Sequence, residues 1–335
     1  MKILIDHHYP FQIAHGGLQI QVEQTFKALR NLGVDVEYLR WWDETQTGDL
    51  IHYFGRPAPN YIRGARKKGI RFVFTELLGA TGARSPGTLR VQWLTNRVFE
   101  RCAPRIVVDR MWWDSYQVTD ACIALTGWEA HLIHWLFNAP PDRVRVIGNG
   151  VETEFLEPEA SVRGKWLVTT ASILPVKRIV ETAQAAAETQ TPYWVIGRPF
   201  SEDDPYFGEF RSLQKRHPEV IRYEGAISDR RQLAQVYREA RGFVMLSQWE
   251  SLSISALEAA ACGCPLLLSD LPWAHSVFGD AATFCRWDAS VEERKRVLSR
   301  FYEAAPSLPV PPQPLGWQEI AESLRSLYKS LLDTK

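Results

Sequence analysis

Short apolar runs alternate with helical patterns from the beginning of the chain. The first run covers residues 3–5, and apolar residues three or four positions apart follow between Leu18 and Leu29. A second run occupies residues 34–39, directly after Gly33, a residue type that commonly ends helices. Because a helix repeats its faces every three to four residues, this spacing predicts a strand, a helix and a second strand.

The alternation continues through two halves of the chain. We expect further strands at residues 50–53, 70–75, 122–125 and 144–147 in the first half, and at 166–171, 193–196, 221–223, 243–246 and 266–268 in the second. Strands that are separated by helices form parallel sheets with helices on both faces. The sequence therefore predicts an α/β protein with two such sheets.

The length of 335 residues agrees with this division, since a single core rarely grows so large. We expect one domain over residues 1–155 and a second over residues 156–312. Five prolines lie within residues 305–314, and because proline cannot continue a helix they predict an extended strap. The remaining residues, 313–335, are expected to form a last helix.

The composition argues against a nucleic-acid-binding protein and against a secreted or membrane-spanning one. Lys plus Arg and Asp plus Glu both number 39, so no long-range attraction to nucleic acid is expected. No stretch approaches the apolar length of a signal peptide or of a membrane span, and we expect a cytoplasmic protein. The 5 cysteines form no C-x-x-C pair and are expected to be free thiols.

Glycine and lysine residues follow predicted strands, at the end of a parallel sheet where ligands bind. Gly16 and Gly17, after His15, precede the first helix, and their lack of side chains lets a phosphate approach the backbone N–H groups. An ordinary turn is the alternative for such a pair. Lys177 follows the strand at residues 166–171; its ammonium either offsets charge on a departing diphosphate or is simply solvated.

The strongest pattern is the pair Glu250 and Glu258 at the start of an alanine-rich helix, which Gly263 and Pro265 end. Eight positions place two carboxylates roughly 80° apart around a helix, so both can face a ligand at its N-terminus. The N–H groups of Ser251, Leu252, Ser253 and Ile254 would face a diphosphate, helped by the helix dipole. In the alternative, Glu250 caps the helix and Glu258 faces solvent.

Residues 250–265, ESLSISALEAAACGCP, resemble the E-x7-E signature of retaining GT-B glycosyltransferases, the family 4-like "glycosyl transferases group 1". Segments 15–17, 147–151 and 172–177 resemble further motifs of that family in the same order. The resemblance implies two Rossmann-like domains facing each other across a cleft, with the C-terminal helix crossing back to the first. It also implies a UDP- or GDP-sugar donor, a saccharide or lipid-linked acceptor, and neither cofactor nor metal.

Position by position, the resemblance implies that Glu250 contacts the transferred sugar, that Glu258 holds the ribose hydroxyls and that Lys177 serves the diphosphate. It implies contacts of the nucleobase with the backbone at Gly225 and Ile227. The whole implied site comprises catalytic Glu250, Lys177 and Glu76, and donor-binding Gly16, Gly17, Lys177, Arg178, Gly225, Ile227, Glu250, Ser251, Leu252, Ser253, Ile254 and Glu258.

The chain departs from the family pattern at three positions. Ser172 stands where an arginine is expected, so Arg178 is a candidate for the missing charge, and Gly148 replaces a proline. Glu76 stands where many relatives carry a histidine. It either accepts a hydrogen bond from the acceptor hydroxyl or caps its loop. A retaining front-face transfer, in which the leaving phosphate takes the acceptor proton, tolerates that change.

Two further segments have competing explanations. Residues 202–204, Glu-Asp-Asp, precede Pro205 and suit helix capping better than a metal site. The segment from Arg84 to Trp113 mixes six arginines with tryptophan and phenylalanine, which is typical of contact with an anionic membrane surface or a lipid-linked acceptor. An ordinary pair of amphipathic helices with solvated arginines is the alternative.

Three functions are compatible with the sequence. The leading one is transfer of a hexose from a nucleotide sugar, because Glu250, Glu258 and Lys177 are all present. The others are a sugar-nucleotide epimerase or hydrolase, and a binding protein without catalysis. Turnover without an acceptor distinguishes the epimerase or hydrolase from the transferase.

Overall fold

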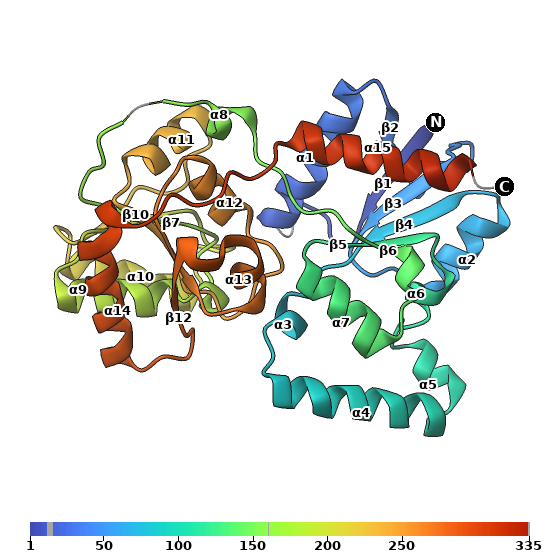
Figure 1. Cartoon of the computed structure of the whole chain (residues 1–335), viewed down its shortest axis with the longest axis horizontal. Coiled ribbons are helices and arrows are strands. Elements are labelled where there is room, and N and C mark those ends of the chain that lie inside the picture. The colour runs from blue at the N-terminus through green and yellow to red at the C-terminus, as the bar shows by residue number, and fades with distance from the viewer. Residues whose placement is uncertain (12–15, 160, 334–335) are drawn as a thin grey trace. The chain divides into compact units, whose positions relative to one another are not determined.

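The computed structural model describes residues 1–11, 16–159 and 161–333, apart from the side chains of residues 105 and 109. The chain divides into two compact units (Figure 1). Unit 1 contains Met1–Asn149 and Trp317–Lys335, and unit 2 contains Gly150–Gly316. Each unit is built on one six-stranded sheet whose strands all run parallel. None of the described helices combines the length and hydrophobicity that crossing a bilayer requires.

The sheet of unit 1 has the strand order β2-β1-β3-β4-β5-β6. Its strands are β1 (Lys2–His7), β2 (Asp35–Tyr38), β3 (Leu50–Phe54), β4 (Arg71–Thr75), β5 (Ala121–Ala124) and β6 (Val144–Val146). Its helices are α1 (Gly17–Asn31), α2 (Pro59–Lys67), α3 (Gly79–Gly82), α4 (Pro86–Cys102), α5 (Arg105–Asp109), α6 (Ser115–Val118), α7 (Gly127–Phe137) and α15 (Trp317–Asp333). Because side chains alternate along a strand, each strand contributes to two cores, one on each face.

The two faces of this sheet are covered by different helices (Figure 1). On one face, α2 and α7 bury Phe72 and Phe74 of β4; on the other, α1 and α15 pack together. On that second face Nδ1 of His52 lies 2.7 Å from the hydroxyl of Tyr328, and Nε2 lies 2.8 Å from the hydroxyl of Thr75. Burial lowers the pKa of His52 to about 3, so the ring is neutral. The last helix is thus an integral part of unit 1.

The sheet of unit 2 has the strand order β12-β11-β10-β7-β8-β9. Its strands are β7 (Leu167–Thr170), β8 (Tyr193–Ile196), β9 (Ile221–Tyr223), β10 (Gly242–Met245), β11 (Leu266–Ser269) and β12 (Ala282–Cys285). Its helices are α8 (Thr153–Leu156), α9 (Ile179–Thr189), α10 (Pro205–Arg216), α11 (Arg230–Glu239), α12 (Ile254–Ala261), α13 (Pro272–Phe278) and α14 (Val291–Ala304). The strand order reverses between β7 and β10, and ligands bind to doubly wound sheets beside such a reversal.

Most predicted elements are confirmed, including the cap at Asp204, whose carboxylate accepts a hydrogen bond from the N–H of Tyr206 at 2.8 Å with Pro205 in the first turn. Strand β12 was missed. Its sequence, Ala-Thr-Phe-Cys, is short and half-exposed at the sheet edge, so it lacks the apolar run that marks the central strands. Helices α2 and α13 were missed as well.

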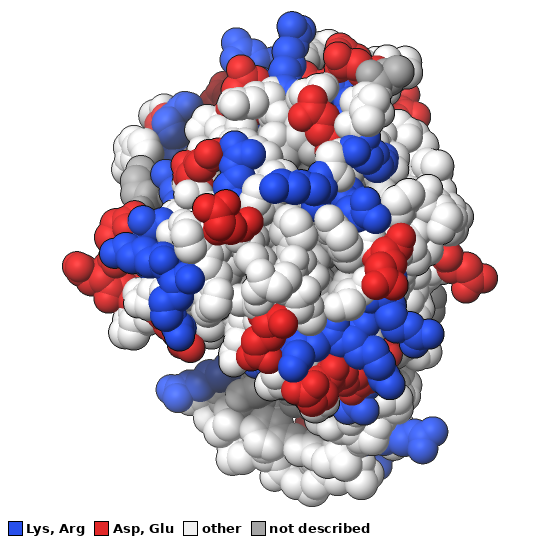
Figure 2. Space-filling model, turned by 90° about the vertical axis from the view of Figure 1, so that its left-hand side faces the viewer, with Lys and Arg blue, Asp and Glu red and all other residues white. Residues whose placement is uncertain are grey.

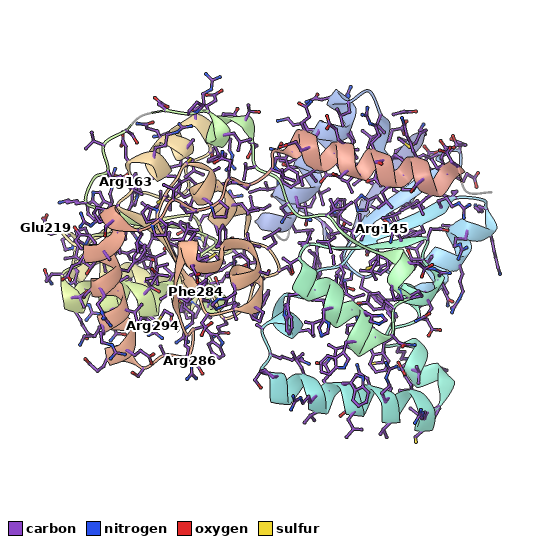
Figure 3. The ribbon with its side chains drawn as sticks, in the orientation of Figure 1. Arg145, Arg163, Glu219, Phe284, Arg286 and Arg294 are labelled. Atoms are coloured by element: carbon purple, nitrogen blue, oxygen red, sulfur yellow. The ribbon has the colours of Figure 1, made fainter. Side chains whose placement is uncertain are left out.

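Arg163 fixes the C-terminal ends of two helices in unit 2 (Figure 3). Its guanidinium donates to the carbonyl oxygens of Tyr237, Arg238 and Ala240 at 3.2, 3.1 and 2.9 Å, and to that of Gly263 at 2.6 Å. These carbonyls lie at the ends of α11 and α12, where backbone oxygens lack helical partners and the helix dipole favours a cation. One side chain therefore fixes α11 and α12 relative to each other.

Candidate active site

Lys177 and Glu250 meet at the reversal of strand order in unit 2. Lys177 ends a short 3-10 turn, η2 (Pro175–Lys177), after β7, and Glu250 lies in the loop after β10. Since β7 and β10 are neighbours, the two loops are adjacent, and the N–H of Gln248 donates to the carbonyl of Val176 at 2.8 Å. Lys177 Nζ forms an ion pair with Glu250 Oε1. Both side chains keep some exposure, 23% and 13%, so a ligand can reach them.

The loop that follows Glu250 leads into α12. This helix begins at Ile254, so Ser251 and Leu252 belong to the loop and Ile254 opens the helix. Ser253 is the N-cap, and its hydroxyl accepts a hydrogen bond from the N–H of Ala256 at 3.3 Å. The side chains of Leu252, Ser253 and Ile254 are buried, which holds the loop against the unit. The positive end of the helix dipole therefore lies beside Glu250.

Glu258 is buried within unit 2, with 3% of its surface exposed. Its Oε1 is paired with Arg230, the first residue of α11, and its Oε2 accepts a hydrogen bond from the hydroxyl of Tyr237 at 3.3 Å. Arg230 also donates to Glu152 from Nε at 2.8 Å and from a terminal nitrogen at 2.6 Å, and it lies over the ring of Phe155. The alternative that Glu258 is a solvated surface residue is wrong, because helix packing encloses it.

The surroundings of Glu258 act on its pKa in opposite directions. Burial raises the pKa to about 7 and outweighs the lowering by Arg230, and the nearby Glu152 raises it further. The charge of Glu258 therefore changes close to neutral pH.

The other predicted donor residues of unit 2 lie around these two centres. Arg178 has the left-handed φ of 55° and pairs with Glu181 at 2.8 Å, so its guanidinium is engaged along α9. Gly225 has a φ of 86°, a backbone conformation that glycine adopts without strain. Gly225 and Ile227 lie in the loop after β9, and this loop leads directly to Arg230 and hence to Glu258.

In unit 1, the predicted glycine loop reaches the start of α1. Gly16 is the N-cap of α1 with a φ of 134°, which other residues rarely adopt, and Gly17 is the first helical residue. Among the described residues, and apart from its chain neighbours and its own helix, no atom lies within 4 Å of the position that a Cβ of Gly17 would take, so the described surroundings leave the backbone there open to a ligand. His15, which precedes them, lies outside the described residues.

Glu76 follows β4 and is 3% exposed. Its Oε2 accepts hydrogen bonds from Arg56 Nε at 2.8 Å and from the hydroxyl of Tyr116, and its Oε1 accepts one from the N–H of Leu77 at 3.0 Å. Arg56 lies over the rings of Tyr116 and Phe137, at 5.0 and 4.6 Å from their centroids. Glu76 therefore does cap its loop through Leu77, and in addition it binds a buried arginine.

A pocket of about 480 Å³ opens beside Glu76 in unit 1. It lies at the carboxyl ends of β1, β3 and β4, where the loops of a parallel sheet form ligand sites. The polar and aromatic side chains that line it include His8, Arg56, Glu76, Arg110 and Trp112. The pocket thus combines cationic groups with an aromatic surface.

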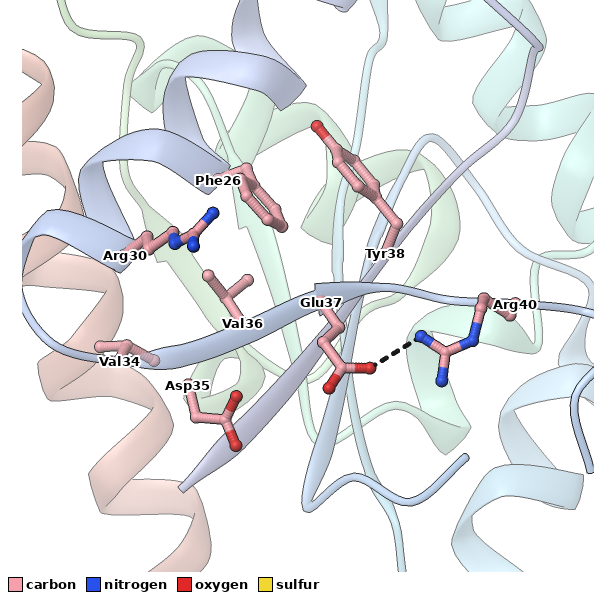
Figure 4. A pocket seen from close by; sticks show the side chains of 8 residues that line it. All are labelled: Phe26, Arg30, Val34, Asp35, Val36, Glu37, Tyr38 and Arg40. Carbon is pink, nitrogen blue, oxygen red and sulfur yellow. Dashed lines mark hydrogen bonds and ion pairs between the residues drawn. The ribbon is translucent and has the colours of Figure 1, made fainter. Parts of the chain in front are cut away.

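A second hollow, of about 560 Å³, lies between α1 and the edge strand β2 (Figure 4). It is lined by Phe26, Arg30, Val34, Asp35, Val36, Glu37, Tyr38 and Arg40. Glu37 and Arg40 pair at 2.9 Å, and the rings of Phe26 and Tyr38 stack. It lies at the outer edge of the sheet, beside β2, and we do not assign it to the active site. Among the described residues no three His, Cys, Asp or Glu side chains form a metal-binding group.

Comparison with known proteins finds similarity in sequence and in fold. Residues 151–304 match the family described as "Glycosyl transferases group 1". The matched segment lies within unit 2. D-inositol 3-phosphate glycosyltransferase of Jonesia denitrificans is 30% identical over 175 residues, which are 45% of this chain and 41% of that protein. GDP-mannose:cellobiosyl-diphosphopolyprenol alpha-mannosyltransferase of Xanthomonas campestris is 29% identical over 139 residues, 39% of this chain and 36% of that protein. The matched part thus spans about two fifths of these relatives.

Solved structures resemble the chain over nearly its whole length. Sucrose-phosphate synthase from Thermosynechococcus elongatus has a TM-score of 0.69 at 16% identity and covers 100% of both chains. HepE of Anabaena in complex with UDP has a TM-score of 0.69 at 13% identity and covers 98% of this chain and 100% of that one. At these identities the likeness concerns the fold, which is the GT-B type.

The sequence did not reveal the partners of the two buried glutamates. Arg230 and Tyr237 reach Glu258 from α11, and Arg56 and Tyr116 reach Glu76 from elements far along the chain. The sequence held an indication only for the partners of Glu258, in unit 2. Arg230 and Tyr237 are seven positions apart, so they share one face of α11. The same spacing is equally typical of a helix surface that carries one solvated arginine.

Proposed function

We propose that the chain is a retaining glycosyltransferase that moves a hexose from a UDP- or GDP-linked donor to a hydroxyl group of a saccharide or lipid-linked acceptor. The observation that carries the proposal is the ion pair of Lys177 and Glu250 beside the N-terminus of α12, at the reversal of strand order. A cation, a carboxylate and a helix dipole at one place suit a sugar diphosphate.

In this proposal Lys177 binds the donor diphosphate and stabilises the charge that grows as the diphosphate leaves. Glu250 then accepts hydrogen bonds from the transferred sugar. In the absence of a donor each side chain serves as the other's partner, which holds both in place. The leaving phosphate takes the proton of the acceptor hydroxyl, so no further general base is needed at Glu76. The N–H groups near Ile254 add donors for the phosphates.

Glu258 is proposed to accept hydrogen bonds from the ribose hydroxyls of the nucleotide. A carboxylate offers about four lone-pair positions, and Arg230 and Tyr237 occupy two of them. Two positions remain for the ribose without loss of the arginine. The backbone at Gly225 and Ile227 is proposed to contact the base, and Arg178 to add positive charge at long range where Ser172 replaces the family's arginine.

The acceptor is proposed to bind in the pocket of unit 1. Trp112 offers a flat face for a sugar ring, and Arg110 offers a charge for an anionic group. The names of the relatives in Jonesia and Xanthomonas include a phosphorylated inositol and a diphosphopolyprenol, which agrees with a phosphate-bearing acceptor. Transfer is proposed to need no metal ion, since Lys177 and the helix dipole supply the neutralising charge.

Calorimetric titration of UDP and GDP, together with transfer rates from the matching sugar nucleotides, tests the proposal. Glu258→Ala should weaken binding of the free nucleotide about 10-fold to 150-fold, because it removes hydrogen bonds to a charged acceptor. Glu250→Ala should leave nucleotide affinity nearly unchanged and lower kcat, because its contact is strongest in the transition state. Lys177→Ala should impair both.

The matched control is Glu219→Ala, which removes an exposed glutamate of the same unit. Wild-type binding and turnover by the Glu250, Glu258 and Lys177 variants would reject the site and the transferase assignment with it. Sugar release at the same rate with and without acceptors would instead identify a hydrolase. Loss of nucleotide binding in EDTA would contradict the metal-independent mechanism.

A further inference from the structure

The outermost helix of unit 1 exposes apolar side chains to solvent. Helix α4 packs its inner face on α7 and buries Leu89 and Asn96 (Figure 1). On its outer side Val91, Leu94 and Val98 are 65%, 57% and 52% exposed. These positions are three and four apart, so they form one continuous stripe along the helix.

Helix α5 extends the stripe. Its Ile106 and Val107, and Met111 after it, are exposed as well. We call the exposed residues Val91, Leu94, Val98, Ile106, Val107 and Met111 the α4–α5 surface. It is aliphatic, because Trp93, Phe99 and Trp113 pack against other aromatic rings and Trp112 lines the pocket beside Glu76. Trp93 stacks on Trp135 with centroids 6.3 Å apart, and Trp113 lies against Phe99 and Phe137.

The charges beside this surface are mostly positive. Residues 84–113 contain six arginines against two acidic residues, Glu100 and Asp109, although the whole chain is neutral. Arg90, Arg97 and Arg101 are seven and four positions apart, so they lie along one flank of the stripe. The face of the molecule in Figure 2, by contrast, mixes basic and acidic side chains. The excess of arginine is therefore a local feature.

We propose that the α4–α5 surface docks on an anionic lipid bilayer. The aliphatic stripe enters the boundary between headgroups and acyl chains, and Arg90 and Arg101 contact the lipid phosphates beside it. Charge complementarity identifies this partner: a second copy docked through the same surface would place arginines against arginines. A nucleic acid would use the arginines but would leave the aliphatic stripe in water. The proposal does not depend on the transferase activity.

Co-sedimentation of the whole chain with vesicles tests the proposal. We expect binding to mixed phosphatidylcholine and phosphatidylglycerol vesicles, weaker binding to phosphatidylcholine alone, and release by salt. Val91→Ser with Val98→Ser should lower the partition coefficient at least about tenfold, because two apolar side chains no longer gain from burial. The matched control is Val162→Ser with Val310→Ser, which changes two valines of unit 2 that are 91% and 74% exposed.

Two further variants separate the contributions of charge and of position. Arg90→Gln and Arg101→Gln should each weaken binding to the anionic vesicles by about fivefold.

Cys102 lies four positions after Val98 and is exposed, so it accepts an environment-sensitive fluorophore once half-buried Cys262 is replaced by serine. We expect its emission to shift to shorter wavelength on vesicles with phosphatidylglycerol and to stay unchanged with phosphatidylcholine alone.

Several outcomes would overturn the proposal. These are equal vesicle binding by the two double-valine variants, no binding of the wild type to anionic vesicles, and an unchanged Cys102 emission while the protein sediments. A dimer that forms with rising concentration and is lost in the Val91 and Val98 variant would assign the surface to a second copy. Binding to an oligonucleotide that is insensitive to that variant would assign the arginines to nucleic acid.

Discussion

Glu76 of unit 1 and Glu258 of unit 2 are two buried glutamates with the same kinds of partner. Both are 3% exposed, and each is held by one arginine and one tyrosine hydroxyl: Arg56 and Tyr116 for Glu76, Arg230 and Tyr237 for Glu258. Each arginine also lies over an aromatic ring. The two networks differ in how many carboxylates share one cation.

Arg56 serves a single carboxylate, which also receives the N–H of Leu77. Arg230 is divided between Glu258 and Glu152, and burial, the largest influence, raises the pKa of Glu258 to about 7. The comparison teaches that a cation shared between two buried carboxylates offsets the burial of each less than a cation that serves one. The four predictions below test that difference.

The largest effect is expected from removal of the arginines. Arg230→Met leaves two carboxylates without their cation and should lower the free energy of unfolding by about 3–5 kcal/mol. Arg56→Met leaves one carboxylate, which keeps Tyr116 and Leu77 as donors, and should cost at least about 1 kcal/mol less. Urea titration with a separate transition fitted for each unit gives both values. Adding Glu152→Gln to Arg230→Met should restore part of the loss; no recovery would contradict the shared-cation explanation.

The second effect is on nucleotide binding and depends on pH. Below pH 7 Glu258 is increasingly protonated, because its pKa is raised, and a protonated carboxyl loses acceptor capacity for the ribose. Affinity for UDP or GDP should therefore rise about tenfold per pH unit up to about pH 7 and then level off. Isothermal titration across this range measures it. Glu258→Gln should remove that slope, whereas Glu76→Gln should keep it; a slope that survives in Glu258→Gln would assign it to the phosphate.

A smaller effect is expected from the two hydroxyl groups. Tyr116→Phe removes a close hydrogen bond to a buried carboxylate and should cost roughly 1.5 kcal/mol of unfolding free energy. Tyr237→Phe should cost about half as much, because its bond to Glu258 is long, at 3.3 Å. It should also move the pH midpoint of nucleotide binding upward, since Tyr237 lowers the pKa of Glu258. Equal losses with no shift of midpoint would show that the two networks are alike.

The smallest effect should come from Glu152→Gln. This change removes a negative charge that raises the pKa of Glu258 and leaves Arg230 to one carboxylate. The pH midpoint of nucleotide binding should move downward, because Arg230 then serves a single carboxylate, as Arg56 does. The same titrations detect the shift, and an upward movement would mean that Glu152 positions Arg230 rather than competing for it.

The sequence predicted the fold well because its main signal is periodic. Apolar runs marked β1, β7 and β10, whose residues are buried on both faces of a parallel sheet. The half-exposed β12 at the sheet edge gave no such run. Local pattern therefore identifies central strands more reliably than edge strands.

The sequence predicted which loops form the candidate site, but it did not predict which side chains pair with each other there. Lys177 and Glu250 follow strands, so pattern alone indicated that both lie at the carboxyl ends of the sheet. Their direct contact follows from the neighbouring positions of β7 and β10, which local pattern does not encode. The partnership of Glu258 with Arg230 depends in the same way on how α11 packs on α12.

The attachment of α15 to unit 1 has a consequence for biosynthesis. Unit 2 is inserted into the sequence of unit 1, so the ribosome completes residues 150–316 before it makes the helix that covers one face of the first sheet. Domains ordinarily fold from the N-terminus during synthesis. Here the hydrogen bond between His52 and Tyr328 joins positions 276 residues apart, so the nascent first sheet keeps an open apolar face until translation of α15. The second unit can therefore finish folding before the first, which depends on a helix made after it.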